Sequence, residues 1–285
     1  LKIEDMTNFK YVNGEYLPDN VAQISINDRS FHFADAVYEV VAVYDKKLLF
    51  WNEHIDRLKL SLKHLNMVYN KSFDVLKIKC KELIQRNDLN EGLIYIHISR
   101  GISKRNHNWN LNLTPSLVIS SIRKKVFDIR QKHISLIFEK DIRWKKCYIK
   151  SVSLLPNVLL KQKAFLNKAQ ECILLDKNRY ITEATTSNIW ILINNNLVTT
   201  PLTSNILPGV TRKKILEIAT NLKIKTVEKK FKIKDLYNAD ATFITNSSSI
   251  IQEANKLGNK KLNIDKSGIL NKLKDKMMYI IQNDK

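Results

Sequence analysis

The sequence lacks any apolar run long enough to cross a membrane, and it contains only three cysteines in 285 residues. A membrane-spanning helix needs about 20 mostly apolar residues, so we expect no membrane partner. Residues 1–14 lack the charged-then-apolar layout of a signal peptide. Cys80, Cys147 and Cys172 are odd in number and show no metal-ligand spacing, which favours reduced thiols in a cytoplasmic protein.

Common signatures of catalysis are also missing. The chain has no HExxH motif, no Walker-type phosphate loop and no GxGxxG motif, and its six histidines show no metal spacing. We therefore predict no metal site. Serine, histidine and aspartate are all present, but such a set indicates a catalytic triad only when geometry brings its members together.

Acidic residues are few compared with basic ones: 28 Asp and Glu stand against 48 Lys and Arg, a formal net charge of +20. Such a charge can indicate nucleic-acid binding. However, 38 of the basic residues are lysines, spread as 18 in residues 1–150 and 20 in residues 151–285. No basic stripe interleaved with stacking aromatic residues is present. The excess of Lys, Asn and Ile is what an AT-rich coding genome would produce, and we predict no nucleic-acid partner.

Residues 1–123 are predicted to form an α/β domain. Asn13-Gly14 between apolar flanks is typical of a β-hairpin. Asn52 and Ser72 can each cap a helix whose apolar residues recur with helical spacing. Alternating apolar runs predict strands over Leu93–Ser99 and Ser116–Ile122.

The charged residues 124–131 indicate a linker, and residues 132–285 indicate a second α/β domain. A cleft between two such domains is a common place for a cofactor. In this second domain, strands are predicted over His133–Phe138, Ile189–Ile193, Leu197–Thr200 and Thr242–Thr245, and helices over Leu155–Ala169, Thr211–Leu222 and Asp265–Gln282.

The most informative stretch is FHFADAVYEVVAVYDKKLLFWNEHIDRL, from Phe31 to Leu58. Its apolar, β-branched run carries a tyrosine–glutamate pair that we expect to be buried, followed by a turn at Asp45–Lys47 and a helix that contains Arg57. This layout resembles the N-terminal half of the fold-type IV pyridoxal phosphate enzymes. That family includes the D-amino-acid and branched-chain aminotransferases and aminodeoxychorismate lyase.

The resemblance covers about residues 10–280 and implies a two-domain α/β (α+β) enzyme with pyridoxal 5'-phosphate in the interdomain cleft. The sequence departs from the family pattern at a few positions. Relatives often have glycine where this chain has Ala34, Ala36 and Ala184, and a common aspartate is replaced by Tyr148. These changes remove some backbone freedom but no reacting group.

Lys150 lies in DIRWKKCYIKSVSLLPN among mostly apolar neighbours. A desolvated lysine has a lowered pKa and can react with a carbonyl group. On this pattern alone a solvated side chain remains the commoner state of a lysine. The resemblance implies that Lys150 is the catalytic lysine that binds pyridoxal phosphate.

Glu183 lies in YITEATTSNIW. Most glutamates at a strand end are simply solvated. The resemblance implies instead that Glu183 contacts the pyridine nitrogen of the cofactor. A carboxylate there keeps the ring nitrogen protonated, so that the ring can accept electrons when the substrate Cα loses its proton.

Two segments are candidates for binding a phosphate. Leu207–Arg212 is a glycine-bearing loop that opens a helix, and free amides at a helix start suit a dianion, although an ordinary capped helix would look the same. Thr245–Ser249 is a run of polar residues at a strand end that could equally be a plain loop. For Arg57 the simpler alternative is an i,i+4 ion pair with Glu53. The resemblance implies that five residues contact the cofactor's phosphate: Arg57, Val210, Thr211, Asn246 and Ser247.

Residues 99–107, SRGISKRNH, follow a predicted strand. They resemble the loop in which D-amino-acid aminotransferases carry an arginine and a histidine that bind the substrate carboxylate together with a tyrosine. The resemblance assigns these roles to Arg105, His107 and Tyr38. A solvated basic loop is the alternative in so basic a chain. In the family this loop reaches the neighbouring subunit, so the resemblance also implies a homodimer.

We therefore expect a D-amino-acid aminotransferase that converts D-alanine and 2-oxoglutarate to pyruvate and D-glutamate. Three alternatives remain open. An L-branched-chain aminotransferase would perform the same chemistry on the other enantiomer, and aminodeoxychorismate lyase would eliminate rather than transaminate. A basic binding protein on a degenerate enzyme fold is the third, and the presence of both Lys150 and Glu183 argues against it.

Overall fold

The computed structural model describes residues 8–126 and 133–283. The chain divides into two compact units. Unit 1 consists of residues Leu1–Val126 together with Ile149–Ser153, and unit 2 consists of residues Phe127–Tyr148 together with Leu154–Lys285. Of the predicted linker 124–131, residues 127–131 lie outside the described part of the chain, and the domain boundaries stay a prediction.

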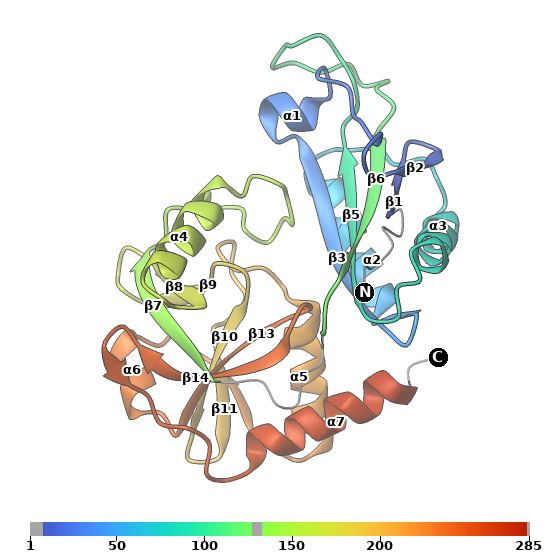
Figure 1. Cartoon of the computed structure of the whole chain (residues 1–285). Helices are drawn as coiled ribbons and strands as arrows, with labels where there is room; N and C mark the ends of the chain where they lie inside the picture. The colour runs from blue at the N-terminus through green and yellow to red at the C-terminus, as the bar shows by residue number, and fades with distance from the viewer. Residues whose placement is uncertain (1–7, 127–132, 284–285) are drawn as a thin grey trace. The chain divides into compact units, whose positions relative to one another are not determined.

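Unit 1 contains a six-stranded antiparallel sheet in the order β2-β1-β6-β5-β3-β4 (Figure 1). The predicted hairpin is confirmed, because β1 and β2 pair across Asn13 and Gly14, which both have a positive φ. The two strands predicted for this domain are also confirmed, as β5 and β6. The strand bounds are β1 Phe9–Val12, β2 Glu15–Pro18, β3 Ala36–Tyr44, β4 Lys47–Leu48, β5 Gly92–Ser99 and β6 Ser116–Arg123.

Three helices accompany this sheet: α1 (Arg29–Phe33), α2 (Trp51–His64) and α3 (Phe73–Arg86). Ser72 caps α3 as predicted, since its hydroxyl accepts the N–H of Asp74 at 3.1 Å. The predicted cap of α2 at Asn52 is wrong. This helix begins one residue earlier, after Phe50 in a left-handed conformation (φ 53°), with no side-chain cap. Phe50 and Trp51 are both buried, so apolar packing rather than a polar cap accompanies the start of α2.

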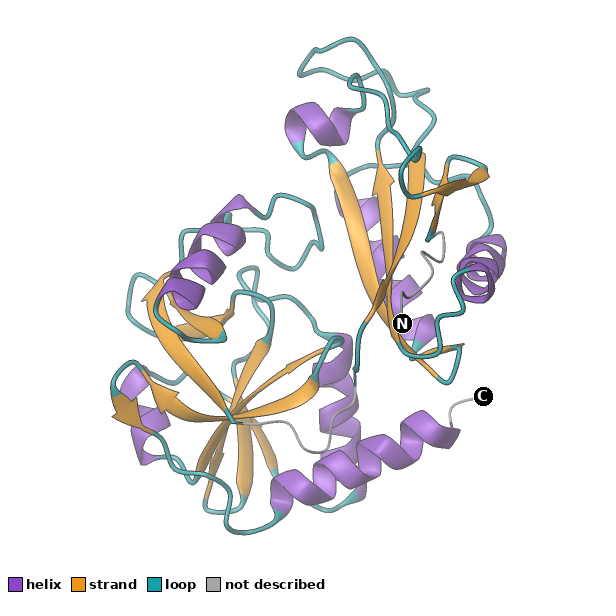
Figure 2. Ribbon diagram, viewed as in Figure 1, coloured by secondary structure: helices purple, strands orange, loops and turns teal. Residues whose placement is uncertain are grey.

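Unit 2 contains a nine-stranded mixed sheet in the order β12-β11-β10-β13-β14-β7-β8-β9, with β15 paired to β14. Figure 2 shows strands in orange and helices in purple. The pairs β7/β8, β7/β14 and β11/β12 are parallel and the others are antiparallel. The strand bounds are β7 Ile134–Lys140, β8 Glu171–Leu175, β9 Ile181–Ala184, β10 Asn188–Ile193, β11 Asn196–Thr199, β12 Thr226–Glu228, β13 Ala241–Asn246, β14 Ile250–Leu257 and β15 Lys260–Lys261.

The helices of unit 2 are α4 (Leu155–Leu166), α5 (Val210–Asn221), α6 (Ile233–Asn238) and α7 (Ile269–Asn283). The predictions of α4 and α5 are confirmed to within a few residues. The predicted start of the last helix at Asp265 is wrong by four residues. The Asp265 carboxylate accepts the N–H of Ser267 at 2.8 Å and of Leu270 at 2.7 Å, so it binds the start of α7 from outside the helix.

The predicted fold class is confirmed, since both units combine helices with a β-sheet. The core of unit 2 is built from apolar side chains of its central strands, such as Ile189, Ile191 and Ile244. Among the residues that the structure describes, no helix is both long and apolar enough to cross a membrane.

Candidate active site

Lys150 belongs to unit 1, where its segment lies along the first residues of β3. Tyr38 donates its N–H to the Lys150 carbonyl at 3.0 Å, and Val152 donates to the Ala36 carbonyl at 3.1 Å. The Lys150 N–H in turn donates to the Ser61 hydroxyl of α2 at 3.1 Å. The main chain of Lys150 is therefore held between the sheet and a helix.

The side chain of Lys150 lies over the ring of Tyr38, with Nζ 4.2 Å from the ring centroid. Tyr38 also packs against Tyr95 of β5, at 5.4 Å between centroids. Unit 1 thus brings together two of the predicted site residues, Lys150 and Tyr38. A cation over an aromatic face is a favourable contact.

Arg57 forms a buried ion pair with Glu39 of β3. Its Nε donates to Glu39 Oε1 at 2.7 Å and its Nη2 to Oε2 at 2.8 Å. His54 Nδ1 lies 2.7 Å from the same Oε2. Because an ionised carboxylate only accepts hydrogen bonds, Nδ1 of His54 carries the proton in this contact.

The pKa values of this group follow from its burial. Burial alone would raise the pKa of Glu39, but Arg57 and His54 outweigh it and hold that pKa below its usual range. Burial also lowers the pKa of His54, although Glu39 partly opposes this effect. Glu39 is therefore the negative partner of Arg57, and His54 is neutral at neutral pH.

The structure shows an ion pair for Arg57 that the sequence did not predict. Of the tyrosine–glutamate pair expected to be buried, Glu39 is buried but Tyr38 is only half-buried. The pairing of Glu39 with Arg57 and His54 was missed. The sequence did point to such a pair, because a glutamate buried among valines needs a cation beside it. The phosphate-binding role of Arg57 stays a prediction.

Arg105 and His107, the other predicted substrate-binding residues, lie in the loop after β5 and are both exposed. They share one neighbour, Phe33 of α1. The guanidinium carbon of Arg105 lies 5.4 Å from the Phe33 ring centroid, and the His107 ring centroid lies 5.2 Å from it. The structure therefore brings this predicted pair together on one aromatic ring.

In unit 2, Glu183 is buried and accepts hydrogen bonds from three groups. Arg143 Nη1 donates to Oε1, and Asn188 Nδ2 donates to Oε2 at 3.1 Å. The N–H of Leu207 lies 3.2 Å from Oε2. A carboxylate offers about four lone-pair positions, so Glu183 can accept one further N–H.

Arg143 connects Glu183 to a second carboxylate. Its Nε and Nη2 donate to Asp141 at 3.0 and 2.8 Å, and its Nη2 also donates to the Asn205 carbonyl at 2.9 Å. Sequence reasoning did not select Arg143 or Asn188, although both lie in the segments that were singled out, DIRW and TTSNIW. Their polar side chains lie close in the sequence to Lys150 and Glu183, and this closeness could have pointed to them.

Burial raises the pKa of Glu183 to about 7, and the Arg143 guanidinium only partly opposes this effect. Burial alone would also raise the pKa of Asp141, but the two hydrogen bonds from Arg143 outweigh burial and lower that pKa. Asp141 is thus the ionised partner of Arg143, while Glu183 changes protonation near neutral pH. Such a carboxyl group can share a proton with a ring nitrogen.

The predicted phosphate-binding residues Val210 and Thr211 are the first two residues of α5 and are buried. Gly209 precedes them as N-cap, no side chain caps the helix, and its first turn contains no acidic residue. The first amides of a helix have no carbonyl acceptor within the helix and attract anions. This helix start is therefore chemically suited to a phosphate.

Gly209 allows the start of α5 to lie directly against Asn188. A Cβ at position 209 would be 2.0 Å from Asn188 Oδ1, closer than real contacts allow. The amide of Asn188 also donates to Glu183 and, at 3.0 Å, to the Leu207 carbonyl. Asn188 thus links Glu183 to the start of α5.

Asn188 also pairs with Thr245 of β13, next to the two remaining predicted residues. Asn246 ends β13 and donates to the Ser187 hydroxyl at 2.8 Å, while its Oδ1 accepts the N–H of Ser248 at 2.9 Å. Ser247 lies in the turn that follows and is half-buried. Unit 2 therefore gathers its predicted cofactor residues around Asn188.

Each unit carries groups that suit a part of pyridoxal phosphate. Glu183 can accept a ring N–H, the start of α5 offers amides to the phosphate, and Lys150 supplies an amine. Among the described residues, no group of three or more His, Cys, Asp or Glu side chains could hold a metal ion.

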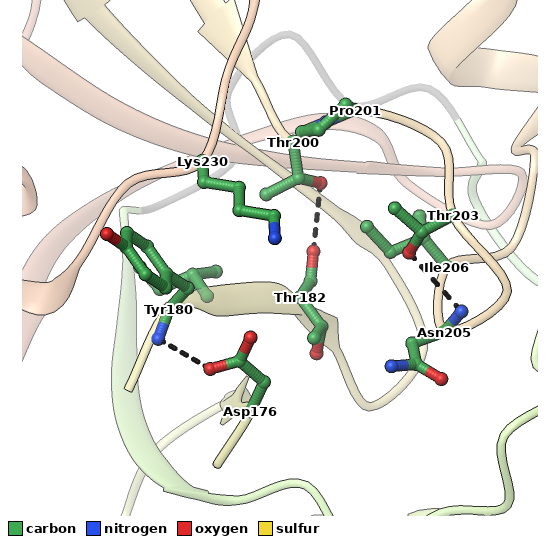
Figure 3. Close-up of a pocket in the computed structure, with 10 residues that line it drawn as sticks. Asp176, Tyr180, Thr182, Thr200, Pro201, Thr203, Asn205, Ile206 and Lys230 are labelled. Carbon is green, nitrogen blue, oxygen red and sulfur yellow. Dashed lines mark hydrogen bonds between the residues drawn. The ribbon is translucent and has the colours of Figure 1, made fainter. Parts of the chain in front are cut away.

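A separate pocket of about 220 Å³ lies in unit 2. Figure 3 shows the Thr200 hydroxyl beside the Thr182 carbonyl in its wall, where they form a 2.9 Å hydrogen bond. None of the predicted site residues lines this pocket. Its lining consists of Asp176, Tyr180, Ile181, Thr182, Thr200, Pro201, Thr203, Asn205, Ile206 and Lys230.

Known proteins resemble this chain over most of its length. A family model described as amino-transferase class IV matches residues 36–257. A D-alanine aminotransferase from Bacillus licheniformis is 35% identical over 238 residues, which cover 83% of this chain and 84% of that protein.

Two solved structures extend the comparison. A branched-chain amino acid aminotransferase from Escherichia coli has a TM-score of 0.85 at 23% identity, covering 96% of this chain and 94% of that one. A putative 4-amino-4-deoxychorismate lyase from Legionella pneumophila has a TM-score of 0.82 at 25% identity, covering 94% and 97%. The first of these shows the fold alone.

The raised pKa of Glu183 predicts a pH-dependent stability. The folded protein keeps a proton on Glu183 up to about pH 7, whereas an unfolded glutamate loses it near 4.5. The proton on Glu183 therefore stabilises the folded protein fully below pH 4.5, and this stabilisation is lost as the pH rises to about 7. Relative to Glu183→Gln, cofactor-free wild type should lose about 3 kcal/mol of unfolding free energy over this range.

Urea titrations of both proteins at several pH values measure this difference. Glu217→Gln, on the exposed side of α5, is the matched control for replacing a glutamate. A difference between wild type and Glu183→Gln that does not change with pH would contradict the assigned proton.

Gly209→Ala should weaken cofactor binding by about 10-fold or more, because the new methyl group displaces Asn188 or the start of α5. Gly258→Ala is the control for replacing a glycine outside the site: its cost is the backbone strain of a positive φ (57°), and its Cβ meets nothing within 4 Å. Titration of each cofactor-free protein with pyridoxal phosphate gives the dissociation constants. Equal constants for the two variants would show that the contact between Gly209 and Asn188 does not shape the site.

Proposed function

The chain belongs to the amino-transferase class IV family, and we propose that it transfers an amino group between a D-amino acid and a 2-oxo acid. It is a pyridoxal-phosphate-dependent aminotransferase. The reaction proposed is D-alanine with 2-oxoglutarate, giving pyruvate and D-glutamate. The observation that carries this proposal is the packing of Arg105 and His107 on Phe33, which places two basic side chains side by side. The D-alanine aminotransferase relative supports the choice of substrate.

The bound cofactor supplies an electron sink for the charge that develops at the substrate Cα. In the proposal, Lys150 would hold the cofactor until the amino group of the substrate displaces it. The freed Nζ would then take the proton from the substrate Cα and deliver it to C4′ of the cofactor, as general base and acid. Glu183 accepts the N–H of the pyridine ring and keeps that nitrogen protonated. Its anchoring by Arg143 and Asn188 holds the carboxyl group in place.

The phosphate is assigned to two segments of unit 2 and one arginine of unit 1. The first segment is the start of α5, where the main-chain amides of Val210 and Thr211 would bind the phosphate. The second is the end of β13, with Asn246 and Ser247. Arg57 contributes a guanidinium that Glu39 orients through two hydrogen bonds. Arginine has five N–H donors, so one side chain can bind both a carboxylate and a phosphate.

Tyr38, Arg105 and His107 are assigned to the substrate carboxylate. Fixing the carboxylate decides which face of Cα presents its hydrogen to Lys150. These residues would thereby select the D enantiomer.

Two related reactions remain as candidates. The family resemblance also allows transamination of an L-branched-chain amino acid. The name of the Legionella protein suggests elimination by a lyase as the second candidate. The Escherichia coli and Legionella proteins are both less similar in sequence to this chain than the D-alanine aminotransferase is.

We also propose a cytoplasmic homodimer. The dimer follows from the family resemblance of the loop that carries Arg105 and His107. The compartment is supported by Cys80, Cys147 and Cys172, which are buried free thiols.

The experiment that tests this function is a half-reaction with single amino acids. D-alanine should convert the bound cofactor to its pyridoxamine form with about one pyruvate per site, as seen in the absorbance spectrum and by pyruvate assay. L-alanine is the matched control, because it carries the same groups with the opposite hand, and it should leave the spectrum unchanged.

Other outcomes identify the alternatives. Conversion by L-leucine alone would indicate a branched-chain aminotransferase. Pyruvate release from aminodeoxychorismate without an amino acceptor would indicate the lyase. Either result would contradict the proposed reaction.

A further inference from the structure

We propose that Arg29 is a positioning residue that holds the segment 105–108 in the conformation in which Arg105 and His107 bind the substrate carboxylate. This inference rests on the proposed function for its role in catalysis. Whether Arg29 restrains the main chain of the loop can be tested without measuring catalysis.

Arg29 binds three consecutive carbonyls of this loop. Its Nη1 donates to the Asn106 carbonyl at 2.7 Å and lies 3.5 Å from that of Asn108, and its Nη2 donates to the His107 carbonyl at 3.2 Å. Arg29 itself is only 3% exposed. A buried cation that satisfies successive carbonyls fixes the path of the main chain between Arg105 and His107.

Asp35 orients the Arg29 guanidinium from the opposite side. Its Oδ2 accepts Arg29 Nε at 2.8 Å and Arg100 Nε at 2.8 Å, and its Oδ1 accepts Arg100 Nη2 at 3.0 Å. Burial alone would raise the pKa of Asp35, but the two arginines outweigh it and keep the carboxyl group ionised. One carboxylate thereby aligns two guanidinium groups.

Arg100 anchors this group to the end of α2. It donates to the Leu65 carbonyl at 2.8 Å and to the Asn66 carbonyl at 3.0 Å. Its guanidinium carbon also lies 4.1 Å from the ring centroid of Trp109, which follows the held segment. The loop is thus tied to the helix that carries His54 and Arg57.

The ring of Phe33 contacts both Arg29 and the two loop residues that Arg29 is proposed to position. Its ring centroid lies 4.8 Å from the Arg29 guanidinium carbon and also contacts Arg105 and His107. The two substrate-binding side chains are exposed, so their direction depends on this ring and on the main chain that Arg29 holds. A lysine at position 29 would keep the charge but lose the planar fork that reaches several carbonyls.

Arg29→Lys is therefore the first variant to test. In single-turnover half-reactions its apparent Kd for D-alanine should rise by about 10-fold or more, while the limiting rate changes by less than about 3-fold. The spectrum of the bound cofactor should stay the same. Arg86→Lys is the matched control, because Arg86 stacks on Tyr16 at 4.5 Å in the same unit, and it should change neither value.

A double-mutant cycle separates positioning from general destabilisation. If Arg29 acts through Arg105, then Arg29→Lys should raise Kd by less than about 2-fold in an Arg105→Ala background. Independent, additive effects of the two substitutions would overturn the inference. Asp35→Asn provides a second variant of nearly the same shape, and it should act in the same direction if Arg29→Lys folds poorly.

Hydrogen exchange over residues 103–109 gives a readout that needs no catalysis. Exchange should be faster in Arg29→Lys than in wild type and unchanged in Arg86→Lys. Unchanged exchange in Arg29→Lys would overturn the inference even if the wild type converts D-alanine. If instead exchange quickens but the wild type converts no D-amino acid, the proposed function fails while the hold on the loop stands.

Discussion

The buried contact between Arg143 and Glu183 is the interaction on which the candidate site of unit 2 depends. One guanidinium binds two carboxylates, Asp141 after β7 and Glu183 on β9, and also the Asn205 carbonyl. Removing Arg143 would leave the ionised Asp141 without its cation, at a cost of about 3–5 kcal/mol. The position of Glu183 in turn determines the places of Asn188 and Leu207, and through Asn188 the start of α5.

Unit 1 contains two further carboxylates that pair with arginines. Glu39, which is buried, binds Arg57 and His54, and Asp35, which is partly buried, binds Arg29 and Arg100. Each carboxylate thereby orients the nitrogen groups around it. Arginine suits this role because its planar fork can bind a carboxylate and still donate to other acceptors. In each unit, arginine side chains near the predicted site residues are therefore paired with carboxylates of the same unit.

Local features of the fold could be predicted from the sequence, whereas long-range pairs could not. The hairpin at Asn13-Gly14 and the Ser72 cap depend on neighbouring residues only, and both were predicted correctly. Arg143 and Glu183 are 40 residues apart, and Arg29 and Asn106 are 77 apart, so no local pattern connects them. The starts of α2 and α7 were wrong because burial of Phe50 and side-chain bonding by Asp265 override simple capping rules.

Reduction with borohydride shows which lysine binds the cofactor, because it converts the imine between them into a stable bond. The cofactor-loaded protein would be reduced and digested, and the modified lysine would be identified by peptide mass. We predict the label on Lys150 and its loss in Lys150→Ala, with Lys145 and Lys146 of the same segment unlabelled as internal controls. A label on any other of the 38 lysines, or one that persists in Lys150→Ala, would contradict the account.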